Sequence, residues 1–143
     1  MLETVKIDVT LNSEYQTTPP KAKVLVAGKE IFRQRVTGPV SLSEEVTIED
    51  GSHNQLIIEL FRKTDDDTTI DEAGNIIEDS TLLIESITID DVDITKELSE
   101  DQDLFYYEHS GQRHQLYNTL GVNGQAVINF SSPIYVWLLE NIG

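Results

Sequence analysis

The stretch TVKIDVTL, residues 4–11, alternates between polar and apolar side chains at every step. Its apolar members are Val5, Ile7, Val9 and Leu11. Side chains in a β-strand point alternately to the two faces of a sheet. The stretch therefore predicts a strand with one buried face and one solvated face.

The same two-residue period recurs along most of the chain, between segments that contain turn residues. The strongest examples are KAKVLVAG (21–28), EIFRQRV (30–36), EEVTIE (44–49), NQLIIELFRK (54–63), STLLIESITID (80–90), LFYYEHS (104–110), RHQLYNTL (113–120) and GVNGQAVINF (121–130). No segment keeps the apolar spacing of a helix over three turns. About eight to ten short strands predict an all-β fold, a single antiparallel β-sandwich or jelly roll. We expect one domain over residues 1–143, with an acidic loop at 64–79.

Turn residues predict how some of these strands connect. Asp50-Gly51 and Asn123-Gly124 are typical of tight turns, and Asn123-Gly124 is the better hairpin candidate. The segments around Gly111 predict another hairpin. Residues 91–103 are polar and acidic, as expected of a crossing between sheets. The apolar tail SSPIYVWLLENIG (131–143) ends the chain as a strand or a short helical turn, and we expect it to dock as a final strand or against a neighbouring subunit.

Composition excludes several classes of function. The formal net charge is −16, from 26 acids and 10 bases, which disfavours nucleic acid and anionic membranes as partners. The chain has no cysteine. It has no run of about 18 apolar residues that would span a membrane, and its first residues do not form a secretory signal.

Residues 64–79 contain seven acids and no base. Calcium takes six to eight oxygen ligands, which such a loop can supply. An EF-hand starting at Asp67 does not fit, because Glu72 stands where that loop needs glycine. The alternatives are an irregular calcium site and a solvated acidic loop.

Catalytic motifs are missing from the sequence. There is no G-x-S-x-G elbow and no glycine-rich phosphate loop, so we do not expect an enzyme. His109 and His114 fall on the two arms of the hairpin around Gly111. With Glu108 they are either a transition-metal site or part of a solvated turn.

Aromatic residues gather in the last third of the chain. Tyr106 and Tyr107 are consecutive and must face opposite sides of a strand, which allows one to be core and the other exposed. We consider Tyr107, Tyr135 and Trp137 as candidate ligand or interface residues, since an exposed aromatic can stack on a sugar or anchor a protein interface. The alternative for Tyr107 and Trp137 is core packing.

Two stretches resemble a known group of proteins. GSHNQLIIELFRKTDDDTTIDEAGNIIEDSTLLIESITIDDVDI (51–94) and FSSPIYVWLLENI (130–142) resemble parts of small β-sandwich proteins of bacteriophages, notably phages of cyanobacteria. Those proteins are similar to the calcium-dependent carbohydrate-binding modules that recognise xylan, and to C2-like sandwiches. The resemblance covers less than half of the chain.

The resemblance implies a non-enzymatic structural or interaction protein of a phage virion, in a fibre, baseplate, neck or capsid decoration. It would assemble in the host cytoplasm with other virion proteins and as a homo-oligomer. The alternative is a calcium-dependent carbohydrate-binding module that attaches to a host-surface glycan. The positions that match a calcium site are Asp65, Asp66, Asp67, Asp71 and Asp79.

Overall fold

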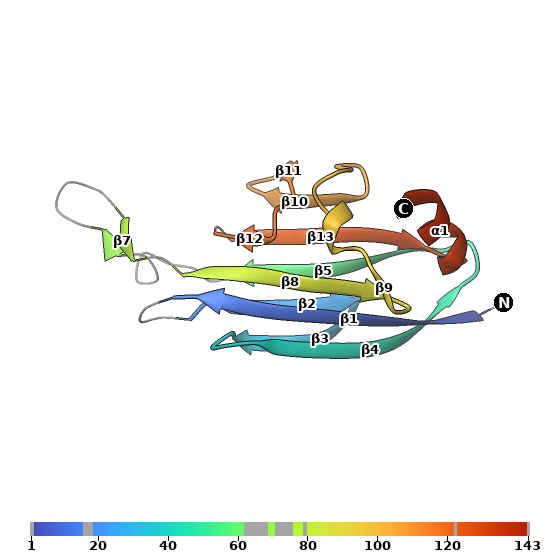
Figure 1. Cartoon of the computed structure of the whole chain (residues 1–143), viewed down its shortest axis with the longest axis horizontal. Helices are drawn as coiled ribbons and strands as arrows, with labels where there is room; N and C mark the ends of the chain where they lie inside the picture. The colour runs from blue at the N-terminus through green and yellow to red at the C-terminus, as the bar shows by residue number, and fades with distance from the viewer. Residues whose placement is uncertain are drawn as a thin grey trace.

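Two antiparallel β-sheets pack face to face and form a sandwich (Figure 1). The computed structural model describes residues 2–15, 19–61, 69–70, 76–78, 80–121 and 123–142, with 69–70 and 76–78 described by their backbone. The predicted all-β sandwich is confirmed. Its strands carry the two-residue burial pattern expected from the sequence, such as alternating buried residues along β2.

The first sheet has the strand order β12-β8-β1-β4, with β9 paired to β8. The bounds are β1 Leu2–Glu14, β4 Val40–Glu49, β8 Thr81–Ile89, β9 Val92–Asp93 and β12 Thr119–Leu120. Strand β1 lies inside this sheet, paired with β4 on one side and with β8 on the other, and its apolar side chains meet the core. Residues 4–11, whose alternation predicted the fold, are therefore part of an inner strand of this sheet.

The second sheet has the order β11-β10-β13-β5-β2-β3. The bounds are β2 Lys21–Val26, β3 Lys29–Arg35, β5 His53–Phe61, β10 Phe105–His109, β11 Gln112–Gln115 and β13 Gly124–Ser131. The predicted hairpin around Gly111 is confirmed, since β10 and β11 pair from Tyr106↔Gln115 to His109↔Gln112. Strand β3 ends this sheet on one side and β11 on the other.

A third, two-stranded sheet joins β6 (Thr69–Ile70) to β7 (Ile76–Glu78). It lies in the segment between the end of β5 and the start of β8. That segment therefore links the second sheet to the first.

One core cluster fills the space between the sheets. Both sheets contribute to it, with Val5, Ile7, Val9 and Leu11 from β1 and Leu56, Ile58 and Leu60 from β5. Residues 91–103 do cross between the sheets, as expected: β9 is followed by the 3-10 helix η2 (Thr95–Glu97) and then by β10. Ile94 and Leu98, on either side of η2, are fully buried and fix this crossing to the core.

The structure corrects two predictions about connections. Of the two forms expected for the tail, the helical one is confirmed, because residues Ile134–Asn141 form helix α1 with Ile134 and Trp137 buried; docking as a final strand is wrong. Asn123-Gly124 is not a tight hairpin turn, because β12 pairs with β8 in the first sheet while β13 pairs with β10 and β5 in the second. No helix among the described residues is long and apolar enough to cross a membrane.

Candidate functional site

A cavity of about 260 Å³ opens where the β10–β11 hairpin meets β12. The chain crosses between the sheets here, because it leaves β11 in the second sheet and reaches β12 in the first sheet within four residues. Buried Leu116 anchors this short link. The described residues that line the cavity are Tyr107, His109, His114, Gln115, Tyr117, Thr119, Leu120 and Gly121.

Tyr107 is the buried wall of this pocket. It belongs to the core cluster and is 7% exposed. Burial raises the pKa of the Tyr107 phenol, with a smaller effect of the same sign from Glu59. A tyrosine hydroxyl is neutral at physiological pH in any case, and burial keeps it so at higher pH.

Tyr117 is the exposed wall. It is 60% exposed and follows the buried Leu116 at the point where the chain leaves the strand pattern. An exposed aromatic ring beside a pocket presents a flat apolar surface. Tyr117 is not among the site residues predicted from the sequence. The sequence does contain one indication that Tyr117 is exposed: it directly follows the apolar Leu116, where the regular alternation ends.

Two histidines lie at the rim of the pocket. The rings of His109 and His114 have centroids 6.1 Å apart, so the hairpin does bring them close together. Nδ1 of His109 donates to the carbonyl oxygen of Asn123 at 2.7 Å, and Nε2 then faces the Ser110 hydroxyl at 3.3 Å. Both ring nitrogens of His109 thus have partners within the protein.

The described residues do not form a metal site around these histidines. Nowhere in the described ranges do three His, Asp or Glu side chains gather as a metal would require. The predicted calcium ligands Asp65, Asp66, Asp67, Asp71 and Asp79 lie outside the described residues. The calcium prediction therefore continues to rest on the sequence.

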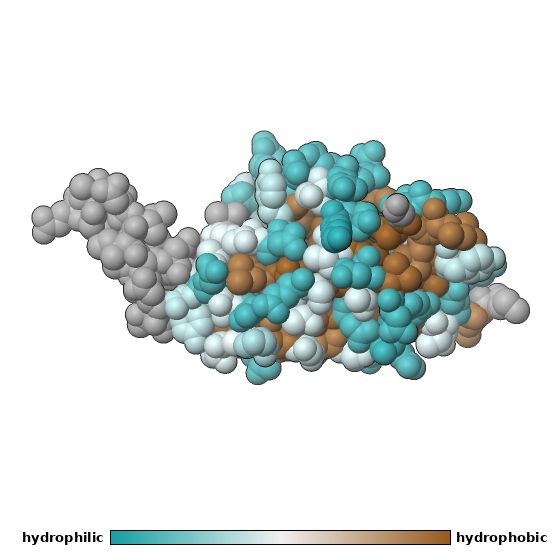
Figure 2. Space-filling view, in the orientation of Figure 1, coloured by the Kyte–Doolittle hydropathy of each residue, from teal (hydrophilic) through white to brown (hydrophobic). Residues whose placement is uncertain are grey.

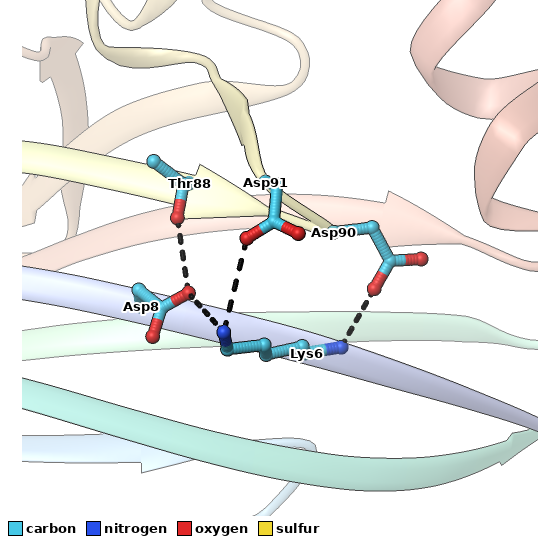
Figure 3. Close-up of polar contacts among 5 residues, drawn as sticks. All are labelled: Lys6, Asp8, Thr88, Asp90 and Asp91. Atoms are coloured by element: carbon cyan, nitrogen blue, oxygen red, sulfur yellow. Dashed lines mark hydrogen bonds and ion pairs between the residues drawn. The ribbon is translucent and has the colours of Figure 1, made fainter.

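In the first sheet, three aspartate side chains lie around Lys6 (Figure 3). The Lys6 ammonium lies 3.9 Å from Asp8 Oδ2 and 3.8 Å from Asp91 Oδ1. The Asp90 carboxylate accepts a hydrogen bond from the Lys6 backbone N–H at 2.8 Å, and Asp8 accepts one from the Thr88 hydroxyl at 3.2 Å. Because the Lys6 side chain is 45% exposed and the Asp91 side chain 84% exposed, these ion pairs contribute little stability.

The other two candidate aromatic residues lie on α1, away from the pocket. Trp137 is 5% exposed, and its ring packs edge-on against Phe105 with centroids 6.1 Å apart. The structure thus places Trp137 in the core. Tyr135 is 63% exposed. The three predicted aromatic residues therefore do not form one site.

Tyr106 faces the opposite side of β10 from Tyr107, as predicted, but it is not exposed. The guanidinium of Arg113 lies 4.1 Å from the centroid of the Tyr106 ring, and only 4% of the residue is accessible. A cation over the ring face is an attractive arrangement. Because Arg113 covers the Tyr106 ring, a ligand cannot stack on it.

Two solved structures of one protein are similar to this chain. A selenomethionine form of vCBM60, described in work on two families of calcium-dependent carbohydrate-binding modules, is 10% identical with a TM-score of 0.47; the match covers 87% of this chain and 89% of that chain. vCBM60 in complex with galactobiose is 12% identical with a TM-score of 0.45, covering 87% of this chain and 98% of that chain. At this identity the likeness is one of fold alone. No family model matches the chain, and no curated protein matches it.

A second exposed feature is the end of the sandwich that carries α1 and the N-terminus of the chain (Figure 1). Figure 2 shows apolar atoms gathered over this end. Leu2, Tyr135 and Leu139 are exposed large hydrophobic residues there, and Leu2 and Tyr135 line one hollow together with Glu3, Asp50, Ser132 and Pro133. We call Leu2, Tyr135 and Leu139 the apolar end.

Proposed function

We propose that the chain is a non-catalytic binding module that takes a neutral sugar in the pocket between β10, β11 and β12. The observation that carries the proposal is the pairing of exposed Tyr117 with a small pocket. An aromatic ring can stack on the apolar face of a sugar, and a few convergent polar groups then fix its orientation.

The polar groups of the pocket suit hydroxyl partners. The Thr119 hydroxyl can donate and accept hydrogen bonds, and the Gln115 carboxamide oxygen can accept them while its Nε2 donates to the Ser99 carbonyl at 3.1 Å. No Asp, Glu, Lys or Arg is among the described residues of the lining. This favours a neutral ligand. It also favours binding over hydrolysis, since most glycosidases use two carboxylates.

Isothermal titration with a panel of neutral oligosaccharides, galactobiose among them, tests this proposal. Tyr117→Ala should weaken binding about tenfold, the loss expected for one stacking contact. Tyr135→Ala is the matched control, because its side chain is equally exposed on α1 and should leave binding unchanged. Equal affinities of wild type and Tyr117→Ala, or no binding by wild type, would contradict the proposal.

A second candidate function, assembly into a larger particle, is favoured by the apolar end. Contiguous exposed apolar residues commonly mark protein interfaces. Such assembly fits the virion protein that the sequence resemblance implies. We expect the double variant Tyr135→Ser, Leu139→Ser to lower the oligomeric mass in sedimentation, with Tyr117→Ser as the control. A wild-type chain that stays monomeric at high concentration would oppose it.

A further inference from the structure

Four of the ten basic residues share one outward face of the second sheet. In β2, Ala22, Val24 and Val26 point into the core, and in β3 Phe32 does so. The alternate residues Lys21 and Lys23 on β2, and Arg33 and Arg35 on β3, therefore point outward. We call these four residues the basic quartet.

The register of the two strands places like charges directly opposite one another. Lys21 pairs with Arg35, and Lys23 pairs with Arg33. Facing side chains start about 5 Å apart, and neighbours along a strand about 7 Å apart. The quartet is thus a compact grid of four cations held by backbone pairing. Like charges directly opposite each other disfavour the folded state.

Protection of a sheet edge explains only half of this grid. Charged side chains on an edge strand prevent unwanted pairing with other chains, and β3 is an edge strand. Strand β2 lies inside the sheet, between β5 and β3. Lys21 and Lys23 are therefore not needed for edge protection. The chain also has 26 acids, so acids rather than arginines could have stood opposite these lysines.

Nearby acids neutralise the quartet in part. Glu30 accepts hydrogen bonds from Arg33, at 2.9 Å from Nε and 2.7 Å from the terminal nitrogen. Arg33, with a smaller effect from Lys23, lowers the pKa of the Glu30 carboxyl. Glu59 lies directly opposite Lys23 on β5. Within the described residues, neither Lys21 nor Lys23 forms an ion pair.

The net charge of the whole chain does not prevent anions from binding here. The Debye length is about 8 Å at physiological ionic strength, so the charges on the same face dominate the local field. A nucleic acid, with about one charge per 1.7 Å of duplex, would extend over the rest of an acidic protein. A polymer with sparser charges avoids that repulsion.

A row of polar side chains extends from the quartet across the sheet. Arg33, Lys23, Glu59 and Gln125 are successive neighbours on β3, β2, β5 and β13, and Gln125 donates to Glu59 at 2.7 Å. Beneath Lys23, Glu59 and Gln125 the backbone of β2, β5 and β13 is paired with a strand on each side. It offers nothing to the main chain of a peptide, whose N–H and C=O groups need partners. Side chains of this kind can bind sugar hydroxyls.

We propose that the face of β2 and β3 binds an anionic polysaccharide, with its carboxylate or sulfate groups on the basic quartet. This surface is separate from the pocket proposed above for a neutral sugar. The charged groups of the polymer lie on Lys23 and Arg33 and on Lys21 and Arg35, and its hydroxyls lie toward Gln125. Binding weakens as salt rises, because the contacts are exposed ion pairs.

Affinity electrophoresis of the full chain tests the proposal with polygalacturonate and a sparsely sulfated dextran as probes. Unmodified dextran, polyglutamate and duplex DNA are the comparison polymers. Wild type should be retarded by one or both anionic polysaccharides at about 0.05 M salt and released at about 0.5 M. The double variant Lys23→Gln, Arg33→Gln should bind about fivefold more weakly. The second double variant, Lys21→Gln with Arg35→Gln, should also bind about fivefold more weakly than wild type.

Two controls separate this surface from other effects. Lys96→Gln removes an exposed base from η2 and should leave retardation unchanged. Tyr117→Ala should also leave it unchanged, so this proposal and the neutral-sugar proposal can fail separately. No retardation by either polysaccharide, equal loss in Lys96→Gln, or equally strong binding of polyglutamate or DNA would overturn the proposal.

Discussion

At the scale of single residues, Gly124 explains how the pocket keeps its buried wall. A Cβ at this position would lie 2.6 Å from the carbonyl oxygen of Glu108 and 2.7 Å from Cε2 of Tyr107. The glycine therefore allows the Tyr107 ring to lie against the start of β13. The Asn-Gly pair predicted a hairpin turn from local backbone preference, but here the glycine is required by a ring from another strand.

We expect Gly124→Ala to destabilise the protein by about 1–3 kcal/mol, the usual cost of overpacking. The new methyl group must displace either the β10 backbone or the Tyr107 ring. Urea denaturation measures the change, and sugar titration should show weaker binding because the pocket wall moves. Gly38→Ala is the control, since a Cβ there meets nothing within 4 Å. Equal stability of the two variants would show that Tyr107 adjusts freely.

At the scale of elements, helix α1 depends on a residue from the far end of the chain. Pro133 precedes the helix and offers no side-chain cap. Instead, Oε1 of Glu3 on β1 accepts hydrogen bonds from the Ile134 backbone N–H and the Ser132 hydroxyl, both at 2.9 Å. A carboxylate at a helix N-terminus is stabilising.

We expect Glu3→Ala to lower the free energy of unfolding by about 1 kcal/mol, as for the loss of a helix cap. Glu3→Gln retains an acceptor oxygen and should lose less. Hydrogen exchange should show faster exchange in α1 for Glu3→Ala than for Glu3→Gln. Identical exchange in both variants and in wild type would mean that Trp137 packing alone holds the helix.

The corner between β9 and η2 predicts a dependence of stability on pH. Asp93 accepts hydrogen bonds from the Thr95 hydroxyl at 2.5 Å and from its backbone N–H at 2.8 Å. These bonds lower the pKa of the Asp93 carboxyl. A group whose pKa is lower in the folded state stabilises the protein above its unfolded pKa, about 3.9, and this contribution is lost as pH falls through the folded pKa.

Urea denaturation at a series of pH values from about 6 to 3 measures this contribution. Wild type should lose more stability across this range than Asp93→Asn, which has no proton to take up. Asp103→Asn is the control, because Asp103 is also an exposed acid. The same pH profile for wild type and Asp93→Asn would rule out this role for Asp93.

Strands could be predicted from the sequence better than their connections. Alternation identified β1, β2 and β8 because each presents one face to the core, and this pattern is local. The tail 131–143 could not be assigned by alternation, since Trp137 and Ile134 are buried on a helix by contacts with distant strands. Tyr117 was missed for the same reason: its exposure beside a pocket depends on β12 joining the other sheet.

At the scale of the whole molecule, the structure separates three surfaces. The neutral pocket lies at the β10–β12 junction, the basic quartet lies on β2 and β3, and the apolar end surrounds α1. In the second sheet, β11 and β3 are opposite edges. A sugar in the pocket and a polymer on the quartet would therefore not compete directly, and the apolar end would remain available for assembly.

The acidic segment gives the last prediction, because it connects the two sheets. Its flanking strands are β5, ending at Phe61 in the second sheet, and β8, starting at Thr81 in the first. If calcium binds to this segment, it stabilises the folded state by mass action, by about 2.7 kcal/mol at a hundred times the dissociation constant. We therefore expect calcium to raise the melting temperature more than sodium chloride of equal ionic strength.

The double variant Asp67→Asn, Asp71→Asn should remove the calcium effect, because these carboxylates are ligands in the predicted site. Asp101→Asn, Asp103→Asn removes two acids elsewhere and should retain it. The ionic-strength control is essential in a chain of net charge −16, since any salt relieves repulsion among so many acids. Equal shifts with calcium and with sodium chloride would show a solvated acidic segment, whereas a shift that only Asp67 and Asp71 control would show a specific site.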